Sequence, residues 1–375
     1  MIRWLLLASL LLGGAGTLTT TGAGAGSSAS YQGPGDIVSG ATAWYGLRAY
    51  SSAYAASLGK SVNLRRASDN VTCDVLVAAS GGLGLTSATC NSSTQGGITP
   101  AAFAGTDATA SCTIAGTAAA CTGASGTIHV NDPVSGVGIS QPCIVTVTNG
   151  STTATVVIAG TSTSCGTVGV AETVTFQVAL FVTKAYDQSG NPNDVAQATA
   201  ANQPQFLPTC LGAGTALPCM RFGGSQYLSS GTVTSIPQPV TASTVAIRTS
   251  AFTSLGLTLS GASNTSVGFN SSANSFLIFA GSVLSATVSD SAWHAIQAVI
   301  NGNGTASDIS ADGSITTGAA GLQSFGTSFV VGALFNGSVD QMNGLMAEDG
   351  FWKIAASSTV QGNLHTNQSA YYGTP

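Results

Sequence analysis

Three carboxylates that lie close together in the sequence, Asp340, Glu348 and Asp349, are the candidates for acid–base chemistry in this chain. Two carboxyl groups on opposite sides of a groove can act as a nucleophile and a general acid, and Asp340 and Glu348 are the pair to consider first. The other glutamate, Glu172, lies in a segment of different composition and is not expected to take part. All three carboxylates stand just before Trp352, so they can also form an exposed acidic loop ahead of the last strand, which is the interpretation that we favour.

A second polar group, Asp187, Gln188 and Asn191, is suited to carbohydrate binding, because carboxylate and amide groups hydrogen-bond to neighbouring sugar hydroxyls. The stretch from Gln188 to Pro192 also has the composition of a turn, in which Asp187 would accept backbone N–H groups. We favour the turn and keep sugar binding as the alternative. Trp352 could stack on a sugar ring or belong to the core.

Metal and cofactor sites are not expected. The chain has three histidines and no C-x-x-C pair, which argues against a zinc site. Asp308, Asp312 and Asp340 could contribute to a calcium site, but they show no Asp-x-Asp spacing that would support one.

The cysteines indicate disulfide bonds and an oxidising compartment. Their number is even, and their sequence neighbours suggest four pairs among the 105 possible connectivities. These pairs are Cys73–Cys90, Cys112–Cys121, Cys143–Cys165 and Cys210–Cys219.

The N-terminus predicts a secretory signal peptide over residues 1–25. Arg3 precedes an apolar run from Trp4 to Leu12, and small residues follow, ending in Ala23-Gly24-Ala25. The run is too short to span a bilayer, so the mature protein is expected to have no membrane span and to be extracellular or displayed on a particle surface. The alternative is a hydrophobic tail that is retained in an assembly.

The charge pattern excludes a nucleic-acid partner. Charged residues make up 6% of the chain, against about 25% in an average domain, and the net charge is −5. Phosphate binding needs clustered Lys and Arg, and the densest cluster here is the pair Arg65-Arg66. With 44% hydrophobic residues, the composition fits a sheet protein whose outer faces carry Thr, Ser and Asn.

Short alternating runs predict an all-β fold with one helix. Strands are expected at 240–247, 275–279, 295–300 and 329–333. From Ala43 to Leu58, apolar residues recur at three- and four-residue intervals and Gly59 follows, which predicts a short amphipathic helix. The order of strands and turns around Trp293-His294 and Asp312-Gly313 is similar to the concanavalin-like, laminin-G-type jelly roll.

Residues 106–176 differ in texture from the rest. They hold four cysteines and repeated Gly-Thr steps, and they contain no aromatic residue before Phe176. This stretch resembles small Gly/Thr-rich β modules of phage tail and bacterial surface proteins. We interpret it as an inserted, disulfide-bonded β module; the alternative is an elaborated loop of the sandwich.

The segments on either side of this stretch carry a family resemblance. Gly33-Pro34-Gly35-Asp36-Ile37, the run from Leu64 to Asp69, and Tyr186-Asp187-Gln188-Ser189-Gly190-Asn191 together resemble the catalytic domain of glycoside hydrolase family 54 α-L-arabinofuranosidases, the arabinofuranosidase B type. The resemblance implies a concanavalin-like β-sandwich formed by residues 33–105 and 177–375.

The family's catalytic residues have no clear counterparts. The region that would hold the nucleophilic glutamate, residues 252–289, contains no Asp or Glu, and Asn336 stands where the acid/base aspartate is expected. An amide cannot act as a general acid, so Asn336 is kept only as a carbohydrate-binding candidate. The family's adjacent cysteine pair is missing too.

These departures favour a carbohydrate-binding or adhesion protein whose partner is a glycan or cell-surface polysaccharide. Homo-oligomers are possible. One alternative is an active α-L-arabinofuranosidase that releases arabinose from arabinan or arabinoxylan side chains. Another is a structural phage appendage or decoration protein.

Overall fold

The computed structural model describes residues 31–375 apart from 84–88, 92–96, 160, 162, 212–216, 250–255, 262–264, 303–305, 335–336 and 338. The expected signal peptide and Asn336 therefore lie outside the described residues. None of the described helices is both long and apolar enough to cross a bilayer.

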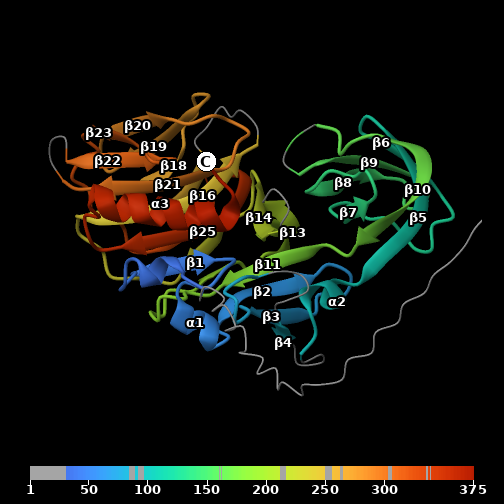
Figure 1. The fold of residues 1–375 in the computed structure, drawn as a ribbon, viewed down its shortest axis with the longest axis horizontal. Coiled ribbons are helices and arrows are strands. Elements are labelled where there is room, and N and C mark those ends of the chain that lie inside the picture. Colours follow the sequence, from blue (N-terminus) through green and yellow to red (C-terminus); the bar gives the residue numbers. More distant parts are fainter. Residues whose placement is uncertain are drawn as a thin grey trace, which may run out of the picture. The chain divides into compact units, whose positions relative to one another are not determined.

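One layer of the main β-structure is an antiparallel sheet built around β25 (Figure 1). Its strands in spatial order are β23 (Ser314–Gly318), β22 (Ser307–Ala311), β21 (His294–Ile300), β16 (Val240–Arg248) and β25 (Asn343–Trp352). The other edge of β25 pairs with β14 (Leu217–Gly223) along its first half and with β1 (Ala43–Gly46) along its second.

A second layer packs on the first, and the expected all-β sandwich is confirmed. Its strands in order are β20 (Val283–Thr287), β19 (Ser275–Phe279), β18 (Ser266–Phe269), β17 (Gly256–Gly261), β24 (Phe329–Val331), β15 (Leu228–Ser230), β12 (Val195–Ala196), β11 (Leu180–Ala185), β2 (Lys60–Arg66), β3 (Thr72–Leu76) and β4 (Thr89–Asn91). Strand β13 (Gln205–Leu211) pairs with both β11 and β14 and so joins the layers.

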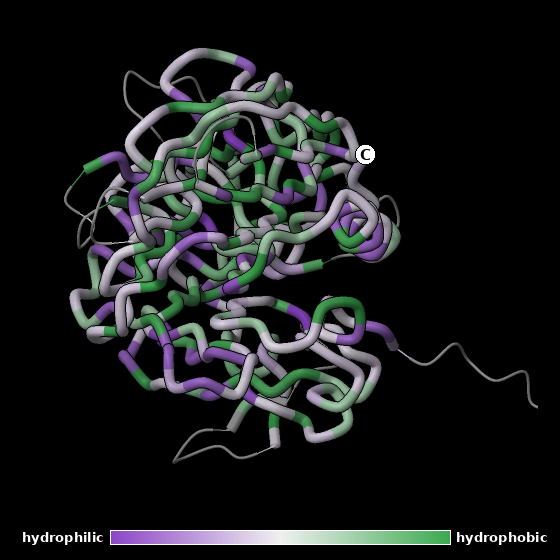
Figure 2. Tube along the Cα trace, turned by 90° about the vertical axis from the view of Figure 1, so that its left-hand side faces the viewer, coloured by the Kyte–Doolittle hydropathy of each residue, from purple (hydrophilic) through white to green (hydrophobic). Residues whose placement is uncertain are grey.

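The core between the layers follows from the alternation of side chains along each strand. Val240, Ala242 and Ala246 of β16 point into it, and Phe351 of β25 packs on Phe329 of the opposite layer with ring centroids 5.5 Å apart. The intervening residues of β16, such as Ser243, face the other side of the sheet, where the C-terminal helix lies. Figure 2 shows that strongly hydrophilic residues are scattered along the chain in short stretches.

Residues 106–177 form a closed six-stranded barrel with its own core (Figure 1). The strands in order around the barrel are β10 (Val168–Gln177), β5 (Thr106–Ala115), β6 (Ala118–Thr122), β9 (Thr153–Ile158), β8 (Cys143–Thr148) and β7 (Pro133–Gly136). Every second residue of β5 is buried from Ala108 to Ile114, as closure around a small apolar interior requires.

The helix expected over residues 43–58 is largely wrong. Residues 43–46 form strand β1, because pairing with β25 outweighs the helical spacing of the apolar residues. The helix α1 (Ser52–Ala56) begins only after Ser51, whose side chain accepts a hydrogen bond from Tyr54 N. Leu58 lies beyond the helix and is 47% exposed.

Other helical segments were not expected. They are η1 (Pro34–Asp36), η2 (Ala200–Asn202), α2 (Pro100–Ala104) and the 15-residue α3 (Ser358–Tyr372). The buried residues of α3 are Gln361, Leu364, Gln368 and Tyr372, so the helix has no continuous apolar stripe by which the sequence could reveal it.

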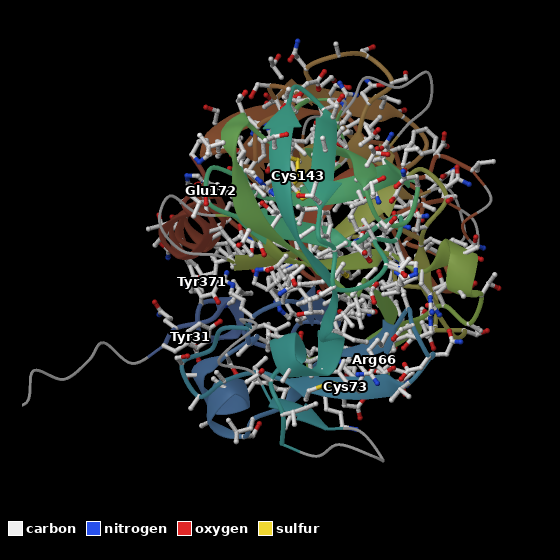
Figure 3. The ribbon with its side chains drawn as sticks, turned by 90° about the vertical axis from the view of Figure 1, so that its right-hand side faces the viewer. Tyr31, Arg66, Cys73, Cys143, Glu172 and Tyr371 are labelled. Carbon is white, nitrogen blue, oxygen red and sulfur yellow. A yellow bond between two sulfur atoms is a disulfide. The ribbon has the colours of Figure 1, made fainter. Side chains whose placement is uncertain are left out.

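The eight cysteines are joined in four disulfides, and disulfide bonding is confirmed. Each bridge connects neighbours in sequence: Cys73–Cys90, Cys112–Cys121, Cys143–Cys165 and Cys210–Cys219. Cys143 lies on a barrel strand and Cys73 on β3 (Figure 3).

The close contact between β25 and two tryptophans predicts that Gly350→Ala destabilises the sandwich. An added Cβ would lie 2.2 Å from Trp44 Cε3 and 3.0 Å from Trp352 Cη2. Overpacking of this kind costs about 1–3 kcal/mol. Urea denaturation of the oxidised protein measures the loss in the free energy of unfolding.

Gly362→Ala is the matched control, because nothing lies within 4 Å of its added Cβ. Alanine is the better helix former, so we expect no loss and a gain of up to about 1 kcal/mol. Equal effects of the two substitutions would contradict the packing argument.

Candidate functional site

Glu348 is a fully buried hydrogen-bond acceptor beneath α3. The Arg48 guanidinium donates to it twice, from Nε to Oε2 at 2.7 Å and from Nη2 to Oε1 at 3.0 Å. Two side chains of α3 complete the set: Gln368 Nε2 donates to Oε1 at 2.8 Å and the Tyr372 hydroxyl to Oε2 at 2.9 Å. Both oxygens are occupied and sealed from solvent, so Glu348 is arranged to hold α3 on the sheet and not to transfer protons to a ligand.

Arg48 is enclosed by aromatic rings as well as by this carboxylate. Its guanidinium carbon lies 4.7 Å from the ring centroid of Tyr371 and 5.2 Å from that of Tyr372. Tyr31, which lies beside Tyr371 (Figure 3), donates its hydroxyl to the carbonyl of Ala49. Burial alone would lower the pKa of Arg48, but the adjacent Glu348 outweighs it and the pKa is raised.

Asp349, the next residue of β25, points to the opposite face of the sheet. It pairs in register with Tyr45 of β1 and Thr244 of β16 and is fully buried. Neither carboxyl oxygen has a well-formed hydrogen bond, because the Thr244 hydroxyl donates to the carbonyl of Glu348 instead. Burial raises the pKa of Asp349 well above its usual range, and the charge of Glu348 adds to the rise. Asp349 is therefore a sealed acid whose neutral form is favoured by its burial.

Asp340 does not join these residues. It lies in the turn ahead of β25, half-buried, with a left-handed backbone (φ 51°). Glu348 is turned into the buried layer under α3, so the structure does not present the two as carboxylates of one open groove. The expected acidic loop before the last strand is also only partly right, because Glu348 and Asp349 belong to the strand itself and are buried.

Asp187 and Gln188 hold the segment that follows β1. Asp187 Oδ1 accepts the backbone N–H groups of Trp44 at 3.0 Å and Ser189 at 2.9 Å. Gln188 accepts from Tyr50 N at 2.9 Å and donates to the carbonyl of Gly46 at 2.7 Å. Both side chains are buried and engaged with backbone.

Asn191 and Trp352 also hold the backbone by donating to main-chain carbonyls. Asn191 Nδ2 donates to the carbonyls of Ala41 and Thr42 at 3.0 and 3.1 Å. Trp352 is 1% exposed, donates from Nε1 to Val38 O at 3.1 Å and packs against Trp44. Trp352 therefore presents no open ring face for stacking on a sugar.

Ser289, His294 and Asp312 have the order of a hydrolase triad but not its function. Nδ1 of His294 lies 2.5 Å from Asp312 Oδ2, while its Nε2 lies 2.7 Å from the carbonyl of Ser289 and 3.4 Å from the hydroxyl. Burial lowers the pKa of His294, but these acceptors outweigh it and the pKa is raised. Because Nε2 faces the Ser289 carbonyl and not the hydroxyl, the imidazole is not placed to act as the base for this serine.

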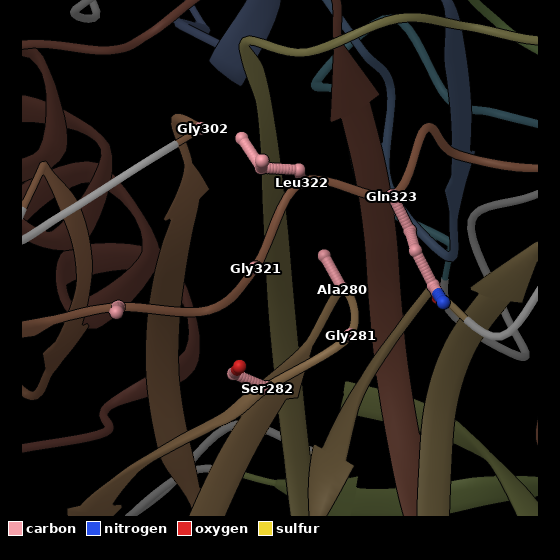
Figure 4. A pocket seen from close by; sticks show the side chains of 8 residues that line it. Ala280, Gly281, Ser282, Gly302, Gly321, Leu322 and Gln323 are labelled. Atoms are coloured by element: carbon pink, nitrogen blue, oxygen red, sulfur yellow. The ribbon is translucent and has the colours of Figure 1, made fainter.

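The loops at one end of the sandwich enclose a cavity of roughly 460 Å³ (Figure 4). It is lined by small and uncharged residues: Ala280, Gly281, Ser282, Gly302, Ala319, Gly321, Leu322 and Gln323. Gln238 connects two of these loops, because it donates to the carbonyls of Gly321 and Gln323 and accepts from the backbone N–H of Gly302. The side-chain hydrogen-bonding groups of this lining are those of Ser282 and Gln323.

A second cavity, of roughly 550 Å³, lies between η1 and α3 and is called here the helix groove. One face of α3 contributes residues at helical spacing, and the N-terminal segment contributes the rest. The lining residues are Gln32, Asp36, Ile37, Asn363, Thr366, Asn367 and Ala370. Amide, hydroxyl and carboxylate groups therefore converge in one groove, and sequence reasoning missed them because α3 itself was not expected.

Comparisons with known proteins support the fold. No family model and no curated protein matches the chain. Among solved structures, it is similar to a GH54 α-L-arabinofuranosidase variant soaked with 4-nitrophenyl α-L-arabinofuranoside, with TM-score 0.56, 12% identity, and coverage of 91% of this chain and 66% of that one. It is also similar to an arabinofuranosidase complexed with arabinofuranosyl-α-1,2-xylobiose, with TM-score 0.55, 13% identity, and coverage of 91% and 65%. The chain thus spans about two thirds of the length of these structures, and the expected GH54-like fold is confirmed.

The network around Glu348 predicts a large loss of stability for Glu348→Gln. Removing one charge leaves the Arg48 guanidinium buried without its counter-ion, which costs about 3–5 kcal/mol. Asp340→Asn is the control, since asparagine tolerates the same left-handed backbone and the change should cost within about 0.5 kcal/mol. Urea denaturation compares the two. A small effect of Glu348→Gln would show that the buried pair does not stabilise the fold.

Asp349 predicts a distinct pH dependence. Because its pKa is raised in the folded protein, its contribution is most favourable below the unfolded pKa of about 3.9 and declines as pH rises toward the folded pKa. Asparagine keeps the shape without the charge, so Asp349→Asn should gain stability relative to wild type as the pH rises above the unfolded pKa of about 3.9, and should match wild type below it. A difference that does not change with pH would contradict a sealed acid.

Proposed function

We propose that this protein binds carbohydrate through a GH54-like β-sandwich without hydrolysing it. The observation that carries the proposal is the state of the carboxylates. All fourteen lie in the part of the chain that the structure describes. Three cavities are compared there: the one enclosed by the loops, the helix groove, and a third against β6, β8 and β9 of the barrel. Of these, only the helix groove has a carboxylate in its lining, Asp36. Glycoside hydrolysis by a carboxylate pair needs two carboxyl groups on opposite sides of the glycosidic bond.

Asp36 itself is engaged in holding the backbone. It accepts hydrogen bonds from Gly33 N at 2.8 Å and from Ser52 N and Oγ at 2.7 and 2.8 Å. A carboxylate with these partners can still accept a hydrogen bond from a ligand hydroxyl, but it has no second carboxylate opposite it in the lining of the groove.

The helix groove is the favoured binding site. Asn363, Thr366 and Asn367 extend from one face of α3, and Gln32 and Asp36 face them. Thr366 and Asn367 donate to the carbonyls of Gly362 and Gln32, but their oxygens can still accept hydrogen bonds from ligand hydroxyls. The loop cavity offers only two hydrogen-bonding side chains in its lining. Asp36 is the one charged residue in the lining of the helix groove. This favours a neutral glycan over a phosphorylated or strongly acidic one.

The four disulfides support a role outside the cell or on a particle surface, because such bonds persist in oxidising compartments. The GH54 structures that share the fold hold arabinofuranosides, and arabinose-containing polysaccharides are therefore the first glycans to test.

The test measures binding and turnover on the same oxidised protein. We expect an arabinan or arabinoxylan oligosaccharide to bind in calorimetry, with Kd weakened at least about tenfold, or about 1.4 kcal/mol, by the pair Asn363→Ala and Thr366→Ala. Hydrolysis of an aryl α-L-arabinofuranoside should not exceed the rate without protein.

Gln323→Ala is the matched control in the loop cavity and should leave Kd unchanged. A loss of binding in this variant alone would move the site to the loop cavity. Turnover that Asp340→Asn abolishes in a folded protein would establish the enzyme instead. Failure to bind any glycan would overturn the proposal.

A further inference from the structure

The barrel gathers three of its four titratable side chains at one place. Residues 106–177 contain Asp107, His129, Asp132 and Glu172, and they contain neither Lys nor Arg. One oxygen from each of the two aspartates and one nitrogen of His129 lie within 4.8 Å of one another. Glu172 lies elsewhere, on the exposed part of β10 (Figure 3).

The donors are held at short range. His129 Nδ1 lies 2.8 Å from Asp107 Oδ2, and Asp132 Oδ2 accepts the backbone N–H of His129 at 2.7 Å. Asp132 is 1% exposed, whereas the His129 side chain is 58% exposed. The set therefore has a buried floor and a side that is open to water.

The buried carboxylate lacks a cationic partner from its own barrel. Two carboxylates at this separation repel each other, and His129, which is half in solvent, is the one titratable group there able to carry a positive charge.

Backbone contacts fix the loop that supplies two of the donors. Ser125 N donates to the carbonyl of Thr109 at 2.9 Å. Gly126 sits so close to β5 that a Cβ at this position would lie 2.0 Å from the carbonyl oxygen of Asp107. The positions of Asp107 and His129 are thus set by the fold and not by their mutual ion pair alone.

We propose that Asp107, His129 and Asp132 bind one divalent transition-metal ion, with water completing its coordination on the exposed side of His129. Mixed carboxylate and imidazole donors suit Zn²⁺ and related ions, whereas Ca²⁺ takes six to eight oxygen ligands and Mg²⁺ prefers oxygen and water. This site revises the expectation that the chain has no metal site.

The ion would fasten the loop of residues 126–132 to β5. The same loop carries Asn131, whose carbonyl accepts from Gln205 Nε2 of β13 at 2.6 Å and whose side chain accepts from Arg221 Nη1 of β14 at 3.4 Å. The metal would therefore stabilise one of the contacts between the barrel and the sandwich strands, beside the apolar contact of Ile144 and Val157.

The experiment uses the full oxidised chain, stripped with a chelator and titrated with ZnCl₂ in a calorimeter. We expect one tight site, and Co²⁺ in the same site should give the visible absorption of a protein-bound ion. His129→Gln and Asp132→Asn should each weaken Zn²⁺ binding at least about tenfold. The melting temperature of the wild type should rise with Zn²⁺.

Glu172→Gln is the matched control, because it removes a carboxylate of the barrel that is outside the cluster and should leave the affinity unchanged. Asp132→Asn replaces a buried carboxyl group with an amide of the same shape, so it should remain folded and keep the comparison valid. If the wild type binds no Zn²⁺, or binds it no better than Asp132→Asn, the proposal is overturned.

Discussion

The buried ion pair between Arg48 and Glu348 is the interaction on which the arrangement of the sandwich depends. Both side chains are fully buried, so their desolvation is costly and must be offset by hydrogen bonds. Glu348 receives four of them, from the loop after β1 and from α3, while itself belonging to β25. The loop after β1 is thereby fixed to β25 and α3, some three hundred residues later, and α3 stays on the sheet although its buried face is largely polar. The position of the helix groove follows from the same contact, because α3 forms one of its walls.

A low number of charges explains why amides and hydroxyls do so much of the structural work. Gln188, Asn191 and Gln238 each bind backbone groups of a segment distant in sequence, a role that a charged side chain would fill at a higher desolvation cost. Gln368 likewise bridges Ser243 and Glu348 beneath α3. The low number of charged residues also leaves the described cavities nearly neutral, which favours uncharged ligands.

Strands were predictable from the sequence where one face of the strand meets the core. The expected strand at 275–279 coincides with β19, and those at 240–247 and 295–300 differ from β16 and β21 by one residue at one end. The expected helix at 43–58 failed because β1 owes its conformation to pairing with β25, some three hundred residues later. Helix α3 carries glutamines where an apolar stripe would be, so periodicity could not reveal it. The role of Glu348 was equally hidden, since the residues that occupy its oxygens come from positions 48, 368 and 372.

The residues that carry the resemblance to GH54 enzymes turn out to be those that hold the backbone. Asp36, Asp187, Gln188 and Asn191 all bind main-chain groups of the segment from residue 33 to residue 52, and none forms part of a pair of opposed carboxylates. A sequence match at such positions indicates that two proteins share turns and strand edges. It does not indicate a shared ligand, because these side chains hold the path of the backbone whatever ligand the protein binds. The similarity of the fold at 12–13% identity is therefore expected even if the chemistry has been lost. Function must be decided at residues that the backbone does not need. Under the proposed function the first of these to test is Asn363 of α3, because Thr366 and Asn367, which also line the helix groove, donate to the carbonyls of Gly362 and Gln32.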